Sequence, residues 1–281
     1  MDRSWIPEHV PVDMPSPARM YDYFLGGAHN FEADRQAAER AIAIYPDFPL
    51  IMRTNRAFLR RVVHYLVDQG IDQFLDLGSG IPTVGNVHEI AQAANPQARI
   101  LYVDLDPIAV AHSAALLRDN PLAMVLQADI REPERLLERV DAQGLLDFSR
   151  PVAVLLAFVL HFVADDTTAD HIVQTLRAVM CTGSYLVISH SAGDGTPPSA
   201  HASLIRLYKD STNPVVSRRP EAIARWLAGL ALVDPGIVRT PLWRPESGQD
   251  LYLDDPQRAS SCAGVALVPA SGPADAADGA R

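Results

Sequence analysis

The feature that most constrains the fold is a fourfold alternation of short apolar segments and longer segments whose apolar residues recur at helical spacing. Consecutive β-α units favour a parallel sheet with helices on both faces, because each helix returns the chain to the same edge of the sheet. Residues 152–158 are continuously apolar, as expected of a central strand buried on both faces. The sequence predicts strands at 73–77, 99–103, 123–127, 152–158 and 184–189, and helices at 84–94, 108–118, 133–140 and 168–180.

Further elements flank this repeating region. The two C-terminal apolar runs are joined by a connector rich in Pro and Gly without helical spacing, so one of these strands is expected to pair antiparallel. We therefore expect an α/β, Rossmann-like fold, in which a seven-stranded, mostly parallel sheet ends in one antiparallel strand. The predicted flanking elements are helices at 19–25, 32–44, 55–69 and 221–230, and strands at 231–233 and 262–268.

The composition restricts the possible partners. A formal net charge of −10 argues against a surface that follows nucleic-acid phosphates. The two cysteines lack the spacing of a metal site or a disulfide framework, and the sequence shows neither a signal-peptide pattern nor an apolar segment of membrane-spanning length. We therefore expect a cytoplasmic protein with no nucleic-acid, membrane or metal partner. The positive charge is concentrated in a run interpreted as an exposed helix face: Arg53, Arg56, Arg60 and Arg61.

A glycine-rich segment, Asp76-Leu77-Gly78-Ser79-Gly80, lies where the first predicted strand passes into the loop before the next helix. In open α/β sheets, ligands bind outside the carboxyl ends of the strands, close to such a loop. Glycines let the backbone turn sharply and approach a ligand, and the following helix offers free N–H groups to an anion. The Asp76 carboxylate suits a cationic group. The loop therefore predicts a ligand that carries both an ammonium and a carboxylate.

Two further acids stand at the ends of the next two strands. Asp104 can accept hydrogen bonds from both hydroxyls of a ribose, and Asp129 can accept one from an adenine amino group. Together with Asp76 they favour S-adenosylmethionine, which combines an amino acid, a ribose and an adenine. The expected cofactor-binding residues are Asp76, Gly78, Ser79, Gly80, Asp104, Leu105, Asp129, Ile130 and Ala157.

A nicotinamide dinucleotide is the alternative ligand for such a loop. The dinucleotide fingerprint G-x-G-x-x-G would place its third glycine at position 83, where this sequence has Thr83. The Asp76 carboxylate would also repel a pyrophosphate. An NAD-dependent oxidoreductase is therefore the weaker alternative.

Taken together, these stretches resemble the motifs of class I methyltransferases. The whole chain is more closely similar to an actinobacterial family of S-adenosylmethionine-dependent methyltransferases that was long catalogued as a domain of unknown function. The similarity spans roughly residues 15–268. It is carried by residues 21–31, 55–61, 73–83, 85–89, 102–104, 160–163, 183–186, 233–236 and 242–245.

The resemblance implies a methyltransferase that uses S-adenosylmethionine. It also suggests an N-terminal extension with a helical lid (1–70) and a class I methyltransferase core (71–268). The remaining tail (269–281) is rich in Ala, Gly, Asp and Pro, so we expect it to be disordered. The loop departs from the wider superfamily, because Pro82 stands near the position of a third glycine. A proline at the start of a helix is compatible with its fixed φ, so we expect the loop to be retained.

The acceptor is predicted from the end of the fourth strand, residues 157–162. The Asp/Asn-Pro-Pro-aromatic motif of many amino-group methyltransferases is missing there, which favours a small-molecule acceptor, with oxygen as the methylated atom. His161 is the candidate general base, and a structural histidine is the alternative. A non-catalytic regulator that binds S-adenosylmethionine also fits the acids.

The N-terminal block 21–30 contains two tyrosines, two adjacent glycines and polar residues that a plain helix end does not require. We expect it to cover the cofactor site as a lid, with a helical hairpin fixed by the glycines as the alternative. The expected lid or substrate residues are Tyr21, Tyr23, Asn30, Arg53 and Asn55.

Overall fold

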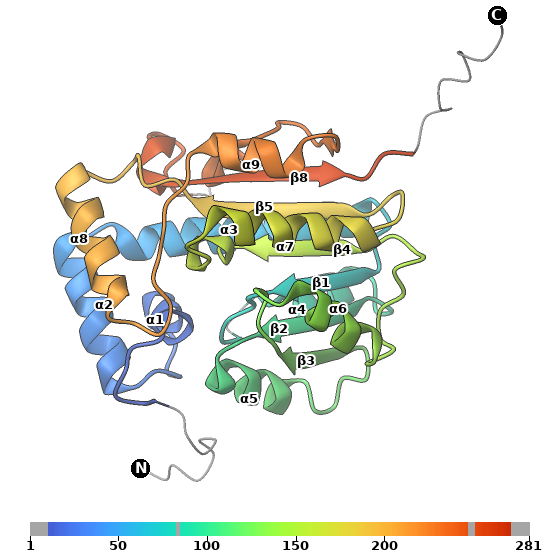
Figure 1. The fold of residues 1–281 in the computed structure, drawn as a ribbon, viewed down its shortest axis with the longest axis horizontal. Coiled ribbons are helices and arrows are strands. Elements are labelled where there is room, and N and C mark those ends of the chain that lie inside the picture. The colour runs from blue at the N-terminus through green and yellow to red at the C-terminus, as the bar shows by residue number, and fades with distance from the viewer. Residues whose placement is uncertain (1–10, 83–84, 247–250, 271–281) are drawn as a thin grey trace, which may run out of the picture.

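The computed structural model describes residues 11–82, 85–246 and 251–270. Its strands form one sheet in the order β3-β2-β1-β4-β5-β8-β6, and β7 pairs with β8 beside this path (Figure 1). The strands are β1 (Gln73–Leu77), β2 (Arg99–Asp104), β3 (Ala123–Gln127), β4 (Ala153–Ala157), β5 (Tyr185–Ser191), β6 (Ala231–Leu232), β7 (Val238–Arg239) and β8 (Ser261–Leu267).

The sheet confirms the predicted Rossmann-like architecture. Strands β1 to β5 pair in parallel, with Leu75 opposite Leu101 and Val154 opposite Leu186. Strand β8 is antiparallel to β5, but it does not end the sheet as predicted, because β6 and β7 pair with its other side. Strand β7 lies within the connector expected to be irregular, and its two residues are too short to give a periodic signal.

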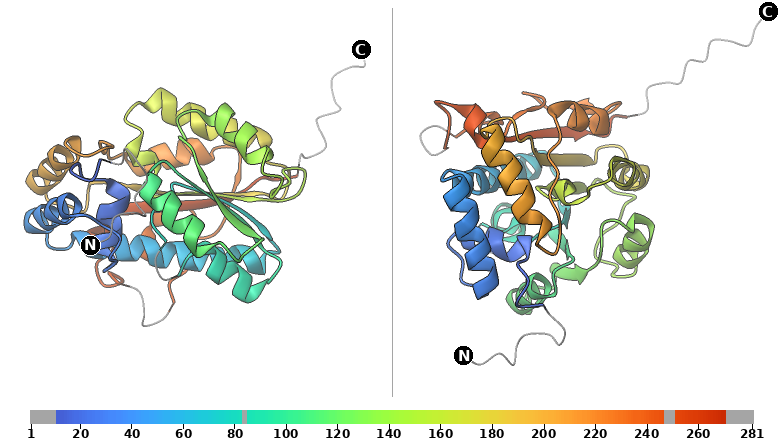
Figure 2. Two further views of the ribbon diagram at one scale, coloured as in Figure 1. Left: turned by 90° about the horizontal axis from the view of Figure 1, so that it is seen from below. Right: turned by 60° about the vertical axis from the view of Figure 1, so that its left-hand side comes forward.

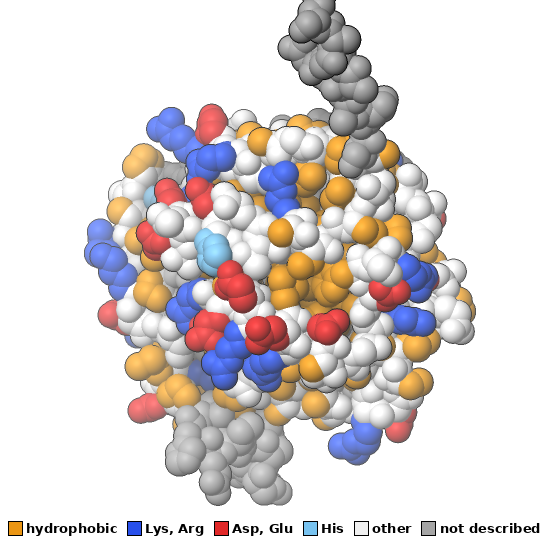
Figure 3. Space-filling view, turned by 45° about the vertical axis from the view of Figure 1, so that its right-hand side comes forward, with side chains coloured by type: hydrophobic (Ala, Val, Ile, Leu, Met, Phe, Trp, Pro, Cys, Tyr) orange, Lys and Arg blue, Asp and Glu red, His pale blue; other side chains and the backbone are white. Residues whose placement is uncertain are grey.

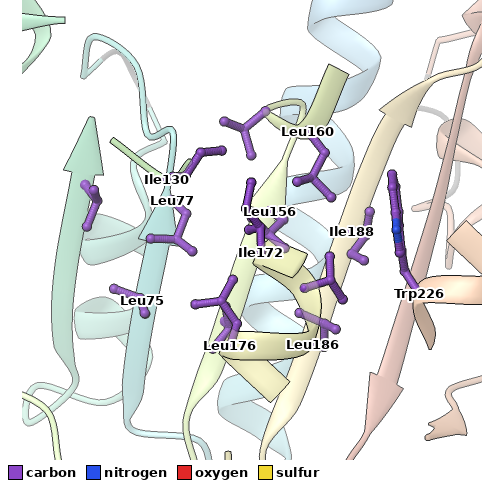
Figure 4. Packing of buried hydrophobic residues seen from close by; sticks show 14 of the residues in the cluster. Leu75, Leu77, Ile130, Leu156, Leu160, Ile172, Leu176, Leu186, Ile188 and Trp226 are labelled. Carbon is purple, nitrogen blue, oxygen red and sulfur yellow. The ribbon is translucent and has the colours of Figure 1, made fainter. Parts of the chain in front are cut away.

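Helices cover both faces of the sheet. Helices α3 and α4 pack on one face in a core that includes Phe58 and Val62, while α6, α7 and α9 pack on the other. Figure 4 shows Ile172 and Leu176 of α7 packed against the leucines of β1, β4 and β5. The helices are α1 (Pro17–Phe24), α2 (Glu32–Ile44), α3 (Phe48–Asp68), α4 (Val87–Ala94), α5 (Pro107–Leu116), α6 (Pro133–Asp141), α7 (Asp166–Val179), α8 (Pro198–Lys209) and α9 (Pro220–Leu227).

Three helices lie beyond the carboxyl ends of the parallel strands. Figures 1 and 2 show α1, α2 and α8 together at this end of the sheet, where α8 packs against α2. Helix α8 was not predicted from the sequence. Two short 3-10 helices, η1 (Leu160–Phe162) and η3 (Pro256–Ala259), also lie near this end.

The ends of several predicted elements are corrected. Helix α3 begins seven residues before the predicted residue 55, because Pro49 fits the first turn of a helix, where its missing N–H is not needed. The predicted start of the helix at 84 and most of the tail expected to be disordered (271–281) lie outside the described residues. Within the described ranges, no helix combines the length and hydropathy that a membrane span needs.

Candidate functional site

A cavity of about 390 Å³ lies at the carboxyl ends of the parallel strands. Its floor is formed by residues at the ends of β1 to β5, and its walls by α1, α3 and α8. All the residues predicted to bind the cofactor line this cavity: Asp76, Gly78, Ser79, Gly80, Asp104, Leu105, Asp129, Ile130 and Ala157.

The glycine loop is held against the end of β2. The Gly78 and Ser79 N–H groups both donate to the Val103 carbonyl oxygen, at 2.8 and 3.1 Å. Gly78 has a φ of +71°, and a Cβ atom at this position would lie 2.3 Å from a methyl carbon of Val159. A glycine is therefore required both by the backbone conformation and by the close approach of the chain that follows β4.

Asp104 fixes the conformation of this loop. Its two carboxylate oxygens accept hydrogen bonds from the Gly80 N–H at 2.7 Å and from the Asp106 N–H at 2.8 Å. Burial nevertheless raises the pKa of Asp104 to about 6. A carboxylate oxygen can accept more than one hydrogen bond, so Asp104 retains lone pairs for a ligand.

Asp76 is a buried acid that faces the cavity. Among the described residues, no side chain or backbone group donates a hydrogen bond to its carboxylate. Burial raises its pKa to about 7, Arg56 opposes this shift, and Asp104 adds to it. A buried carboxylate without hydrogen-bond donors is stabilised by a cation that enters the cavity.

A second unsatisfied polar atom lies beside Asp76. The Ser79 hydroxyl oxygen is buried and makes no hydrogen bond within the described part of the chain. Arg56 lines the cavity close enough for its charge to lower the pKa of Asp76. A carboxylate, a guanidinium and a hydroxyl at one place match the ammonium and the carboxylate of an amino acid.

Asp129 lies just beyond the end of β3 and pairs with Arg131. The Arg131 guanidinium contacts both of its carboxylate oxygens, with distances of 2.6 to 2.9 Å. The hydrogen bonds from Arg131 hold the pKa of Asp129 below its usual value, although partial burial opposes them. Ile130 is buried and offers an apolar surface beside this acid.

The N-terminal segment is fastened over the β2 end of the cavity. Arg19 is 1% exposed and pairs with Asp34 at 2.9 Å and with Asp106 at 3.6 Å. The Ser16 hydroxyl donates to the same Asp106 carboxylate. These contacts tie α1 to the loop after β2, so residues far apart in sequence enclose the cavity together.

The predicted lid residues divide into two groups. Tyr21 and Asn55 line the cavity, and the Asn55 amide links the Tyr21 hydroxyl (3.2 Å) to the Ser189 hydroxyl (2.7 Å). The structure does not bring the other three to the cavity. Tyr23 hydrogen-bonds Glu39, Asn30 hydrogen-bonds the Asp22 carboxylate, and the Arg53 side chain is exposed.

Gly27 has a packing role within this block. A Cβ atom at Gly27 would lie 1.9 Å from a carboxylate oxygen of Asp22, which is 1% exposed. The Asp22 carboxylate also accepts from the His29 N–H. The hairpin that the sequence offered as an alternative is therefore present, and it coexists with the contribution of Tyr21 to the cavity.

His161 lies in η1, after β4, and lines the cavity. The residue is 5% exposed, and its Nδ1 atom makes no hydrogen bond within the described residues. Burial, and to a lesser degree His190 and Arg218, lower its pKa well below 6.5. The ring is therefore neutral at physiological pH, and it lacks the near-neutral pKa with which histidines usually act as general bases.

The His190 ring lies beside the His161 ring, with the ring centroids 5.7 Å apart. Its Nδ1 atom lies 2.8 Å from the Ser191 carbonyl oxygen, which only accepts, so Nδ1 carries the proton. Its Nε2 atom then accepts from Arg218 at 3.3 Å. Both ring nitrogens of His190 are satisfied by the protein.

Several residues of the site were missed in the sequence. The arginine run is not one exposed face, because Arg61 is buried and donates to the Trp243 carbonyl oxygen, while Arg56 lines the cavity. Phe158 adopts a φ of +59°, which a bulky residue rarely does. The helical spacing of Leu204 and Tyr208, which both line the cavity, was the available signal for α8.

Comparisons with known proteins agree on one family. A family model described as S-adenosyl methyltransferase matches residues 3–269. The chain is 40% identical to a candidate methyltransferase from Thermobifida fusca of known structure, with a TM-score of 0.87, covering 95% of this chain and 100% of that one. It is 35% identical to a DUF574 family protein from Streptomyces avermitilis, with a TM-score of 0.86, covering 92% and 99%. No curated protein shows a significant match.

Proposed function

The chain belongs to the S-adenosyl methyltransferase family, and from this premise we propose that it methylates a small-molecule acceptor held beside the ends of β4 and β5. It is a methyltransferase that uses S-adenosylmethionine. When bound, this cofactor supplies an electrophilic methyl group on a sulfonium sulfur, and the reaction leaves S-adenosylhomocysteine.

The methionine part of the cofactor is assigned to the half of the cavity that lies over β1 to β3. We propose that the Asp76 carboxylate accepts hydrogen bonds from the ammonium, while the Ser79 hydroxyl and the N–H groups of the glycine loop bind the carboxylate. The observation that carries this assignment is the buried Asp76 carboxylate, which faces the cavity without a hydrogen-bond donor from the described chain. A partner of opposite charge relieves the unfavourable burial of this group.

The nucleoside is assigned to the ends of β2 and β3. Asp104, already oriented by two backbone N–H groups, is positioned to accept from the ribose hydroxyls. Leu105, Ile130 and Ala157 provide apolar surface, and Asp129 provides an acceptor for the adenine amino group after adjustment of its pair with Arg131.

Residues 1–70 are proposed to act as an N-terminal extension and lid on the core formed by residues 71–268. Tyr21 and Asn55 wall the cavity, and the ion pairs of Arg19 hold α1 against the core. This enclosure excludes water from the acceptor and the methyl group, which methyl transfer requires.

His161 is proposed as the residue that contacts the acceptor. Because its ring is neutral, it can accept a hydrogen bond from an acceptor hydroxyl and orient the oxygen. Its lowered pKa makes it a weak base, so orientation is its larger contribution.

The proposal is tested by titrating the protein with S-adenosylmethionine and with NAD under the same conditions. We expect binding of the former only, and then transfer of its labelled methyl group to a component of a metabolite extract. Binding of NAD alone would overturn the proposal. Tight S-adenosylmethionine binding with no transfer to any acceptor would favour a regulatory protein instead.

A further inference from the structure

We propose that the second half of the cavity, over β4, β5 and α8, binds an uncharged, largely aromatic molecule whose hydroxyl group meets His161. This inference rests on the proposed function and adds the chemical class of the acceptor. Apart from Ala157, which ends β4 at the boundary between the halves, the residues assigned to the cofactor do not form this part of the cavity.

Charge is distributed unequally along the cavity. Every Asp, Arg, Lys or Glu side chain among its described lining residues comes from α1, from α3 or from the ends of β1 to β3. The arginines lie over these three strands, because Arg19 pairs with Asp106, Arg131 pairs with Asp129, and the charge of Arg56 lowers the pKa of Asp76. These residues are Arg19, Arg56, Asp76, Asp104, Asp106, Asp129 and Arg131. The described lining of the second half contains no such side chain.

The second half instead combines aromatic and apolar side chains with His201 and with uncharged polar side chains such as Ser191, Thr196 and Asn213. Phe158 and Phe162 follow β4, Phe48 and Met52 come from α3, and Tyr208 comes from α8. These side chains belong to one hydrophobic cluster, and the Phe48 and Tyr208 rings lie 6.4 Å apart. Flat aromatic molecules gain the most from such a surface, because their faces and edges pack favourably against other rings.

At least two polar groups in this half make no hydrogen bond with any described residue. The His161 Nδ1 atom is buried without a hydrogen bond, and the Tyr208 hydroxyl makes none with any described residue. Burial raises the pKa of Tyr208, so its hydroxyl is neutral. A neutral hydroxyl on the ligand can both donate and accept, and it therefore satisfies either group.

Charged acceptors fit this half poorly. A carboxylate or an alkylammonium would lose its hydration without meeting an opposite charge in the described lining. A hydroxyl compound loses much less and regains hydrogen bonds from His161 and Tyr208.

A pair of matched probes tests this inference. 2-Naphthol is neutral and aromatic, while 6-hydroxy-2-naphthoate has the same rings and hydroxyl with an added carboxylate. Each is titrated calorimetrically into protein saturated with S-adenosylhomocysteine. We expect 2-naphthol to bind at least tenfold more tightly than the naphthoate.

Two variants on α8 locate the binding. Ile205 lines the cavity, whereas Ala202 is exposed on the same helix and does not. Ile205→Glu should weaken 2-naphthol binding at least tenfold and leave S-adenosylhomocysteine binding unchanged, which also reports that the variant is folded. Ala202→Glu should change neither. If Ile205→Glu does not fold, the comparison of the two probes on the unmodified protein decides alone.

The outcomes separate the two proposals. If S-adenosylhomocysteine binds but 2-naphthol does not, or if the naphthoate binds equally well, the assignment of the acceptor is overturned and the methyltransferase proposal stands. If S-adenosylhomocysteine itself does not bind, the proposed function fails.

Discussion

The two halves of the cavity are built on different principles. The half over β1 to β3 contains acidic and basic side chains that the backbone orients, and Asp104 is bonded to two N–H groups of neighbouring loops. The half over β4, β5 and α8 contains rings and unpaired neutral polar groups. A ligand with fixed charges, the cofactor, suits the first half, while a neutral acceptor suits the second. We therefore propose that the two molecules bind in different halves of one cavity because their charges differ.

The largest expected effect is that of Asp76→Asn on cofactor binding. Removing the charge that meets the ammonium should weaken S-adenosylhomocysteine binding by about 3 kcal/mol, which is more than a hundredfold. Binding of 2-naphthol should not change, because Asp76 lies in the other half. Calorimetric titration measures both.

Asp72→Asn is the matched control for this substitution. Asp72 precedes β1 at the opposite end of the strand, and its ion pair with Arg150 is partly exposed. An equal loss of cofactor affinity in both variants would show that the effect is not local to the cavity. It would contradict the assignment of the cofactor to the half that contains Asp76.

Gly78→Ala should lower the stability of the protein, because it changes the backbone where the two halves of the cavity meet. Its Cβ atom would collide with Val159, the residue that leads from β4 into the acceptor half, and would also impose a positive φ on alanine. We expect a loss of about 3 kcal/mol in the free energy of unfolding, measured with urea.

Gly80→Ala separates the cost of a positive φ from the cost of a steric clash. Gly80 has a φ of +67°, but nothing lies within 4 Å of the Cβ atom that a substitution would add. The expected loss is about 1 kcal/mol. Equal losses at the two positions would contradict the close approach of Val159 to the loop.

The pH dependence should differ between the halves. The pKa of Asp76 is raised to about 7, and only the ionised carboxylate binds an ammonium, so S-adenosylhomocysteine affinity is highest well above pH 7 and falls as the pH drops through this pKa. From pH 8 to pH 6 we expect about a tenfold loss. The pKa of His161 lies well below 6.5, so 2-naphthol binding should stay constant over this range. A parallel loss for both ligands would refute the assignment.

The smallest expected effect is that of Asp129→Asn. The Asp129 carboxylate is already engaged by Arg131, and the adenine amino group is neutral, so the lost hydrogen bond is worth about 1 kcal/mol. Cofactor affinity should fall about fivefold in the same titration. A loss as large as that for Asp76→Asn would give Asp129 a greater role than its geometry supports.

The charged half could be predicted from the sequence because it is local. Asp76, Asp104 and Asp129 each lie at or just beyond the carboxyl end of a recognisable strand, and parallel strands bring these ends to one edge. The conformation of the loop is equally local, since Gly78 and Gly80 both adopt positive φ.

The acceptor half depends on contacts between distant segments. Phe48, Phe158 and Tyr208 meet only after α3, the end of β4 and α8 have packed together. The pKa of His161 depends on burial and on Arg218, neither of which a single sequence reveals. The prediction that Tyr23, Asn30 and Arg53 line the cavity was wrong, because sequence spacing cannot tell which side of a short helix or turn faces inward.

The absence of a nucleic-acid partner stays a prediction from the charge of the chain. On the face shown in Figure 3, Lys and Arg side chains lie interspersed with Asp and Glu and form no continuous basic surface. Phosphate recognition generally requires such a surface, and the net charge of −10 does not provide it.

A crystal structure of the protein with bound S-adenosylhomocysteine tests the central claim most directly. The account predicts the ammonium at Asp76, the ribose at Asp104, the adenine beside Ile130, and the sulfur directed toward Phe158 and His161. A nucleoside bound without contact to Asp76 and Asp104, or one that fills the aromatic half over α8, would contradict it.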